Sequence, residues 1–322
     1  MRVVVIGGTG HIGSYLVPRL VEAGHDVTVV GRGHRAPYFG HGAWTTVGEV
    51  TADREAEEPA NAFGDRIAGL DPDIVIDLIC FTQASAQQLV DGLRGRIQHF
   101  LHCGTIWVHG ASTRVPTTED GPRRPLTPYG KRKAEIEQYL HQQARTTGFP
   151  ATVIHPGHIT GRGWVPVNPA GNVNPAVFQR LADGEPVSLP DRGLTTLQHV
   201  HADDVARLFL AAIAHRAVSI GESFHAVSHE AVTMRGYAEA TAAWFGRAAR
   251  LDYLPWDRWK ETVDDEDARV TEDHLRHSPH CGVGKAHRLL GHHPRYTGLE
   301  ATQDALSWMT VDGTITSARP QE

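Results

Sequence analysis

The chain has 322 residues, 40 % hydrophobic and 21 % charged, a balance typical of a soluble globular protein of two domains or of one domain with a large lobe. No stretch approaches the roughly 20 apolar residues of a membrane span, and no signal peptide is recognisable at the N-terminus. The net charge of −6 argues against a nucleic-acid surface, and the three widely spaced cysteines predict free thiols in the cytoplasm.

The N-terminal stretch predicts a dinucleotide-binding unit. A β-branched strand over residues 3–8 runs directly into GGTGHIG, in which Gly7, Gly10 and Gly13 recur every three residues. A helical pattern follows up to Ala23, and residues 25–30 form the next predicted strand. Between a strand and a helix, glycines let the chain turn tightly and let a pyrophosphate approach the helix N-terminus.

The end of the second predicted strand bears on the choice between NAD and NADP. A carboxylate at this place would hold the adenosine ribose of NAD and repel a 2′-phosphate. Here the position is Gly31, followed by Arg32 and soon by Arg35. Because a guanidinium pairs with a 2′-phosphate, the sequence favours NADP, with NAD as the alternative.

Two later segments bring candidate catalytic residues. Residues 97–101 predict a strand that ends in CGTIWVHG, which contains Thr105. The stretch TPYGKRKAEIEQYL begins with turn residues and continues as a predicted helix. Tyr129 and Lys133 are four residues apart in it, so they share one helix face.

With these motifs the chain resembles the extended short-chain dehydrogenase/reductase family, a group of NAD(P)-dependent epimerases and dehydratases. The resemblance continues through the TAD at 51–53, the HPG at 155–157 and VHADDVA at 200–206. It implies that Tyr129 is the catalytic base and that Thr105 hydrogen-bonds the reacting oxygen. Lys133 would hold the nicotinamide ribose and, with the positive nicotinamide ring, lower the pKa of the tyrosine. The cofactor contacts expected on this basis are Gly7, Gly10, His11, Ile12, Gly13, Arg32, Arg35, Asp53, Lys133, Pro156 and Gly157.

Two departures from the family pattern bear on the reaction and the substrate. Sugar dehydratases of this family carry Asp and Glu after the catalytic threonine, where this chain has Ile106 and Trp107. Hydride transfer without loss of water is therefore predicted. Leu197 stands where nucleotide-sugar epimerases carry a diphosphate-binding arginine, which leaves a free sugar, polyol, nucleoside or natural-product intermediate open beside a sugar nucleotide. Substrate contacts are expected from Trp107, His158, Asn172 and Asn174, and no spacing among the 21 histidines predicts a metal site.

The predicted architecture is an α/β fold, a Rossmann doubly wound parallel sheet with a smaller C-terminal substrate-binding lobe. Residues 1–155 and about 196–227 are assigned to the Rossmann domain, and residues 156–195 and 228–322 to the lobe. The resemblance implies a homodimer formed by helices near 84–94 and 130–144.

Three functions stay open on the sequence. The first is an NAD(P)-dependent epimerase that acts on a sugar, sugar nucleotide or related polyol or nucleoside through a transient ketone. The second is an NADP-dependent reductase or dehydrogenase of a small carbonyl or natural-product intermediate. The third is a non-catalytic dinucleotide sensor or an RNA-associated protein, against which the intact Thr105, Tyr129 and Lys133 set counts.

Overall fold

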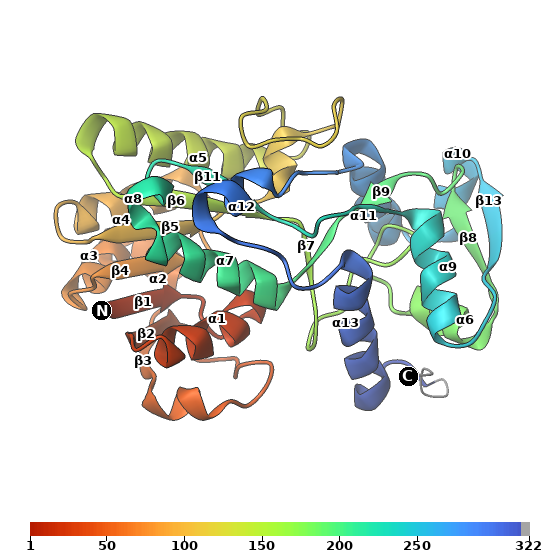
Figure 1. The fold of residues 1–322 in the computed structure, drawn as a ribbon, viewed down its shortest axis with the longest axis horizontal. Coiled ribbons are helices and arrows are strands. Elements are labelled where there is room, and N and C mark those ends of the chain that lie inside the picture. Colours follow the sequence, from red (N-terminus) through yellow and green to blue (C-terminus); the bar gives the residue numbers. More distant parts are fainter. Residues whose placement is uncertain (317–322) are drawn as a thin grey trace.

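A seven-stranded parallel sheet forms the centre of the molecule (Figure 1). The structure is a computed structural model and describes residues 1–316. The strand order is β11-β6-β5-β4-β1-β2-β3, so the chain reverses its direction of winding between β1 and β4. In such sheets a ligand binds in the crevice at the carboxyl ends of the strands, at this reversal. The strands are β1 (Arg2–Ile6), β2 (Asp26–Gly31), β3 (Gly48–Thr51), β4 (Ile74–Asp77), β5 (His99–Cys103), β6 (Ala151–Pro156) and β11 (Ser223–Ala226).

Helices cover both faces of this sheet, which explains why its strands are apolar throughout. In β1, Val3 and Val5 belong to the core on one face, while Val4 and Ile6 belong to the core on the other. This alternation is the two-residue period of an extended strand. One face is covered by α1 (His11–Glu22), α7 (Ala202–Ala214) and α12 (Gly284–Leu290), and the other by α3 (Ala62–Gly69), α4 (Gln83–Leu93) and α5 (Pro128–Thr147). The predicted doubly wound Rossmann sheet is confirmed.

The remaining elements build a smaller lobe with its own hydrophobic core, in which Phe178, Tyr237 and Trp259 are buried. Its elements are α6 (Ala176–Asp183), β8 (Pro186–Pro190), α9 (Met234–Trp244), β13 (Arg250–Leu254), α10 (Trp256–Trp259), α11 (Asp265–His277) and α13 (Gly298–Asp312). Two short strand pairs occur outside the central sheet: β7 (His158–Thr160) with β10 (His199–His201), and β9 (Thr196–Leu197) with β12 (Val232–Thr233), the latter packed in the lobe core. The short helices are η1 (Gly42–Thr46), α2 (Arg54–Glu57), η2 (Glu58–Ala60), η3 (Ile106–His109), α8 (Arg216–Ser219) and η4 (Lys260–Thr262).

The packing differs at two places from the domain division predicted from the sequence. Leu197, assigned to the Rossmann domain, is buried in the lobe core because β9 pairs with β12 of the lobe. Helix α12, assigned to the lobe, packs against the sheet, and its Ala286 and Leu290 join the core beneath α1 and α7. The other predicted bounds stay a prediction, and residues 317–322 of the assigned lobe lie outside the described residues. Within residues 1–316 no helix has the length and apolar character needed to cross a membrane.

Candidate active site

The turn from β1 into α1 is shaped for close approach of an anion. Gly7 has a φ of +80°, a left-handed conformation that glycine adopts without strain. A Cβ on Gly13 would lie 2.0 Å from the carbonyl oxygen of Gly8, so this position admits no side chain. Gly10 caps α1 without any side-chain hydrogen bond, and the first turn contains no acidic residue. The N–H groups and the dipole at this helix end are therefore available to a pyrophosphate.

His11 and Ile12 occupy the first turn of α1 with buried side chains. Ile12 packs in the core beneath the sheet, and the His11 ring stacks on Trp164, with 5.2 Å between ring centroids and 7° between the planes. Burial lowers the pKa of His11 to about 4, so its imidazole is neutral at physiological pH. The cofactor contacts predicted for both residues therefore depend on their backbone N–H groups.

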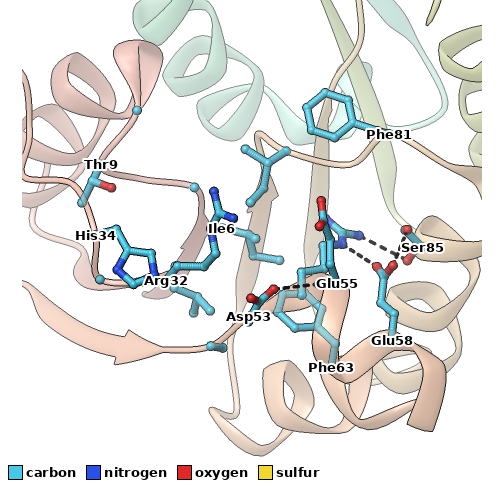
Figure 2. A pocket seen from close by; sticks show the side chains of 18 of the residues that line it. Ile6, Thr9, Arg32, His34, Asp53, Glu55, Glu58, Phe63, Phe81 and Ser85 are labelled. Atoms are coloured by element: carbon cyan, nitrogen blue, oxygen red, sulfur yellow. Dashed lines mark hydrogen bonds and ion pairs between the residues drawn. The ribbon is translucent and has the colours of Figure 1, made fainter.

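A cavity of about 460 Å³ opens beside the glycine-rich turn (Figure 2). Arg32 and Arg35, from the loop after β2, and Asp53, from the turn after β3, all line it together with Gly7 and Gly10. The Asp53 carboxylate also accepts hydrogen bonds from the backbone N–H groups of residues 55 and 56 and so begins α2. Arg35 donates to the Tyr38 hydroxyl at 2.9 Å, and neither Arg32 nor Arg35 forms an ion pair within residues 1–316. Two guanidinium groups thus stand at the cavity end expected to hold the adenosine ribose.

A buried ion pair that was not anticipated from the sequence lies under this cavity. Arg54 Nη1 donates to both carboxylate oxygens of Asp77, at 3.0 and 2.9 Å, and its Nε donates to Glu58 at 2.6 Å. Ser85 completes the cluster with a 2.8 Å hydrogen bond to Glu58, visible in Figure 2. A buried guanidinium with two carboxylates fixes the start of α2, and so the turn that carries Asp53, against the end of β4.

The three predicted catalytic residues meet at the carboxyl end of β5. Thr105 follows this strand and is buried, and its side chain lies close to the hydroxyl of Tyr129. Tyr129 and Lys133 share one face of α5, with Lys133 Nζ 5.9 Å from the centroid of the tyrosine ring. The helix begins at Thr127, whose side chain caps it, and Pro128 occupies its first position, where a missing N–H costs nothing.

Burial and the neighbouring Thr105 side chain both act on the ionisation of Tyr129. Burial raises the pKa of Tyr129 above its ordinary value of 10, and the hydrogen bond with Thr105 acts in the lowering direction. The Lys133 ammonium donates to two backbone carbonyl oxygens, and the lowering effect expected from it stays a prediction. The remaining positive charge near this hydroxyl in the family mechanism is that of the oxidised nicotinamide ring.

Lys133 is fully buried and held in one position. Its Nζ donates to the carbonyl oxygens of Cys80 at 2.8 Å and Cys103 at 2.7 Å, which follow β4 and end β5. Burial lowers the pKa of Lys133. The ring of Phe81, 50 % exposed, lies 4.9 Å from Nζ and also lines the cavity. An ammonium has three donors, so one remains for a ribose hydroxyl at the cavity.

The residues that follow Thr105 carry no proton-transfer group. Ile106 is buried, and the indole of Trp107 stacks on His277 of α11, with ring centroids 4.3 Å apart. Trp107 also meets Tyr129 edge to face at 6.4 Å. It therefore lies between the catalytic helix and the lobe, beside the predicted base.

The other three predicted substrate contacts are engaged inside the chain. Asn172 accepts from Asn168 at 2.5 Å and donates to Thr271, while Asn174 donates to Asp267 of α11 at 2.8 Å. These bonds tie the loop before α6 to α11. His158 accepts the backbone N–H of residue 198 at its Nδ1, and its buried Nε2 has no hydrogen-bond partner within residues 1–316. Substrate contact by His158, Asn172 and Asn174 stays a prediction.

Pro156 ends β6, which pairs with β5 in the sheet, and Gly157 follows it. A Cβ on Gly157 would lie 2.6 Å from the carbonyl oxygen of Gln198, so the glycine permits the close approach of β6 to the segment between β9 and β10. Leu197, the last residue of β9, is fully buried, so this position offers no positive charge to a diphosphate.

One group of potential metal ligands occurs among the described residues. Asp77, Cys80 and His102 place ligand atoms within 4.8 Å of one another. However, Arg54 pairs with Asp77, and burial raises the pKa of Cys80 to about 12, which disfavours a thiolate ligand. With Lys133 also bound to the Cys80 carbonyl, the site is already rich in positive charge. That the protein binds no metal stays a prediction.

A comparison with protein-family models matches residues 3–226 to the NAD dependent epimerase/dehydratase family. The chain belongs to this family. The predicted resemblance is thereby confirmed, and as a family member the chain is an enzyme that uses a nicotinamide dinucleotide.

Individual relatives of this chain are named for different activities. The 2′-dehydrokanamycin reductase of Streptomyces kanamyceticus is 24 % identical over 99 % of this chain and 87 % of its own length. The chloroplast stem-loop binding protein of 41 kDa b of Arabidopsis thaliana is 27 % identical over 75 % of this chain and 62 % of its own. The UDP-glucose 4-epimerase of Streptomyces lividans is 26 % identical over 67 % of this chain and 72 % of its own length. Among solved structures, the UDP-glucose 4-epimerase of Thermotoga maritima with UDP-glucose superposes with a TM-score of 0.72 and 22 % identity, over 97 % of this chain and 99 % of that one.

Proposed function

We propose that this enzyme is an NAD(P)-dependent epimerase that inverts a carbinol carbon through a transient ketone. The observation that carries the proposal is the Thr105, Tyr129 and Lys133 cluster with no carboxylic acid beside Thr105. A bound nicotinamide ring supplies the hydride acceptor and donor. Tyr129 takes the hydroxyl proton as the hydride leaves and returns it afterwards, and Thr105 hydrogen-bonds the same oxygen. Lys133 holds the ribose with its remaining N–H group.

The substrate class follows from what surrounds the proposed site. Leu197 is fully buried in the lobe core, so this position offers no positive charge to bind a diphosphate. We therefore propose a sugar, polyol, nucleoside or related natural-product intermediate, with a sugar nucleotide as the less favoured substrate. Trp107 would pack against it opposite the nicotinamide.

Epimerisation by hydride transfer predicts the fate of one hydrogen atom. The hydrogen on the inverted carbon leaves to the cofactor and returns to the opposite face, so it never exchanges with solvent. Product formed in deuterated water should carry no deuterium at that carbon, as measured by NMR with UDP-glucose, UDP-galactose and then unphosphorylated sugars. Deuterium at that carbon would instead indicate carbanion chemistry, and this result contradicts the proposal.

A second candidate function is an NADP-dependent reductase of a small carbonyl compound. The similarity to 2′-dehydrokanamycin reductase extends over nearly the whole chain, and Arg32 and Arg35 line the cavity without carboxylate partners. A net change of two hydrogens between substrate and product identifies this reaction. Nicotinamide retained through purification favours the epimerase, and an empty protein that binds NADPH favours the reductase.

We propose NADP as the preferred cofactor, on the same two arginines. Arg32→Ala should weaken NADPH binding at least tenfold and change NADH binding less than twofold, because only NADPH carries the 2′-phosphate. Fluorescence titration with both cofactors measures this. Lys131→Ala, on an exposed turn of α5, serves as the control for loss of a positive charge. Equal losses for both cofactors, or tighter NADH binding by the wild type, contradict the preference.

The assembly and the cellular setting are also proposals. We infer a homodimer through α4 and α5, from the family resemblance, and a cytoplasmic enzyme, from three buried cysteines without disulfide bonds. The stem-loop binding relative favours the RNA-associated function, but the net charge of −6 and the assembled catalytic cluster favour a small-molecule enzyme.

A further inference from the structure

A third residue continues the catalytic face of α5. Glu137 follows Tyr129 and Lys133 at the same four-residue interval, and it is 2 % exposed. Arg123 binds both of its carboxylate oxygens, with 2.8 Å between Nε and Oε2. The proposed mechanism gives this buried, charged group no part.

His155, at the end of β6, joins Glu137 to the catalytic strand. Its Nε2 lies 2.8 Å from Glu137 Oε1, and its Nδ1 accepts the backbone N–H of Thr105 at 3.0 Å. Because Nδ1 must be an acceptor here, Nε2 carries the proton and donates it to the carboxylate. A Cβ on Gly104 would lie 2.4 Å from Nδ1, so the imidazole is packed directly against the turn before Thr105.

We propose that His155 and Glu137 are positioning residues, which set the Thr105 hydroxyl against the Tyr129 hydroxyl. The proposal rests on the proposed function, in which these two hydroxyls act on one substrate oxygen. Thr105 follows the end of β5, and Tyr129 lies at the start of α5. The 24 residues 104–127, which include the 3₁₀ helix η3, separate these two elements in sequence. Two hydrogen bonds, from Thr105 to His155 and from His155 to Glu137, link the end of β5 to α5, the helix that carries Tyr129.

Such a connection matters because hydride and proton transfer tolerate little displacement of the groups involved. A misplacement of about 1 Å caused at a distance can cost on the order of a hundredfold in rate. A group fixed by a second layer of hydrogen bonds keeps its geometry, whereas one held by a loop alone does not. His155 holds the backbone of Thr105, and Glu137 holds the imidazole in the required tautomer.

A second arm of the same network points away from the site and supplies a matched control. Ser223 of β11 donates to Glu137 Oε1 at 2.6 Å, and His141 lies 2.7 Å from the Ser223 hydroxyl. Neither residue contacts Thr105 or Tyr129 in the described hydrogen bonds. If Glu137 had a purely structural role, losing its hydrogen bond with Ser223 would have the same effect as losing its hydrogen bond with His155.

The test uses two substitutions that divide the functions of the imidazole. The amide oxygen in His155→Asn can replace Nδ1 as the acceptor for Thr105, whereas the amide in His155→Gln reaches the place of Nε2 beside Glu137. We expect hydrogen exchange of the Thr105 amide, followed by NMR, to accelerate at least tenfold in His155→Gln. It should stay within threefold of wild type in His155→Asn and in Ser223→Ala.

The environment of the Tyr129 hydroxyl is measured separately by NMR, with tyrosine labelled by ¹³C at the ring carbon that bears the hydroxyl. The Tyr129 resonance, assigned by its loss in Tyr129→Phe, should move in His155→Gln toward its position in Thr105→Val. It should keep its wild-type position in Ser223→Ala and move partway in His155→Asn, which keeps the acceptor for Thr105 but loses the hydrogen bond to Glu137. Wild-type exchange and resonance in His155→Gln, or equal changes in Ser223→Ala, overturn the proposal.

Two features keep this test decisive. Where His155→Gln does not fold, Glu137→Gln is measured in the same way and should accelerate exchange of the Thr105 amide at least threefold. Neither measurement needs substrate turnover, so a failed proposed function, shown by full activity of Tyr129→Phe, is distinguishable from a failed positioning role.

Discussion

Tyr129→Phe should lower turnover by at least a hundredfold while cofactor affinity changes less than threefold. The substitution removes the only atom that can take the proton of the reacting hydroxyl, and general acid–base catalysis is worth about 10²- to 10⁴-fold. The ring itself stays, so its packing against Trp107 and its position 5.9 Å from Lys133 Nζ are preserved. Steady-state kinetics with a titration of NADPH binding separates the two effects.

Tyr139→Phe is the matched control for this experiment. Tyr139 lies on the same helix, half-buried against the core on the outer side of the sheet, and contacts none of the three catalytic residues in the described hydrogen bonds. Its substitution should leave turnover within twofold of wild type. Full activity of Tyr129→Phe would falsify the proposed mechanism, whatever the chemical class of the substrate.

Acid should unfold this protein well above the pH at which its carboxylates protonate. Burial lowers the pKa of several histidines from 6.5 to about 4. The unfolded chain therefore takes up protons first as the pH falls below about 6.5, so stability is complete above that pH and is lost progressively down to about 4. The histidines in this group are His11, His99, His109, His199, His274 and His292.

The expected loss in the free energy of unfolding approaches the total free energy of unfolding of the protein. Each such histidine costs about 1.4 kcal/mol per pH unit once the unfolded chain is protonated. Several acting together lose several kcal/mol per pH unit, against a total stability of about 5–15 kcal/mol for a typical protein. We expect the urea midpoint to fall steeply between pH 6.5 and 5 and the native state to be lost near pH 5.

A pair of substitutions identifies the groups responsible. His99→Gln can keep the hydrogen bond to Thr152, 2.8 Å from His99 Nε2, without a group that protonates in this range. Its stability should therefore fall less steeply with pH than that of the wild type. His215→Gln, at an exposed position, should reproduce the wild-type slope. A flat stability profile from pH 7 to pH 5 in the wild type would show that the buried imidazoles do not control acid unfolding.

Local patterns account for most of the sheet and for the catalytic cluster. The β-branched run of β1, the glycines of the following turn and the four-residue interval between Tyr129 and Lys133 each depend on the two periods of regular structure. The cavity residues Arg32, Arg35 and Asp53 follow from strand ends, because parallel strands bring their carboxyl ends to one edge. These features are properties of short segments.

Features that join distant segments were not predictable in this way. Asn172 and Asn174, whose contact with the substrate stays a prediction, form hydrogen bonds to Thr271 and Asp267, more than 90 residues away in the sequence. Leu197 and α12 pack on the side opposite to the predicted domain division, because β9 pairs with β12 and α12 packs against the core that contains α1 and α7. The sequence around an amide or aliphatic side chain does not indicate which distant residue it will contact in the fold.

By itself, the sequence determined the Rossmann sheet, the glycine-rich turn and the shared helix face of Tyr129 and Lys133, since strand and helix periods place them without knowledge of distant contacts. Only the tertiary structure decided the environment of those residues. Burial, which depends on every neighbouring segment, raises the pKa of Tyr129, and the fold places Lys133 against two carbonyl oxygens, one after β4 and one at the end of β5. It also brings Glu137 and His155 behind Thr105, because the free energy of a buried hydrogen bond depends on which groups the fold places within about 3 Å of each other.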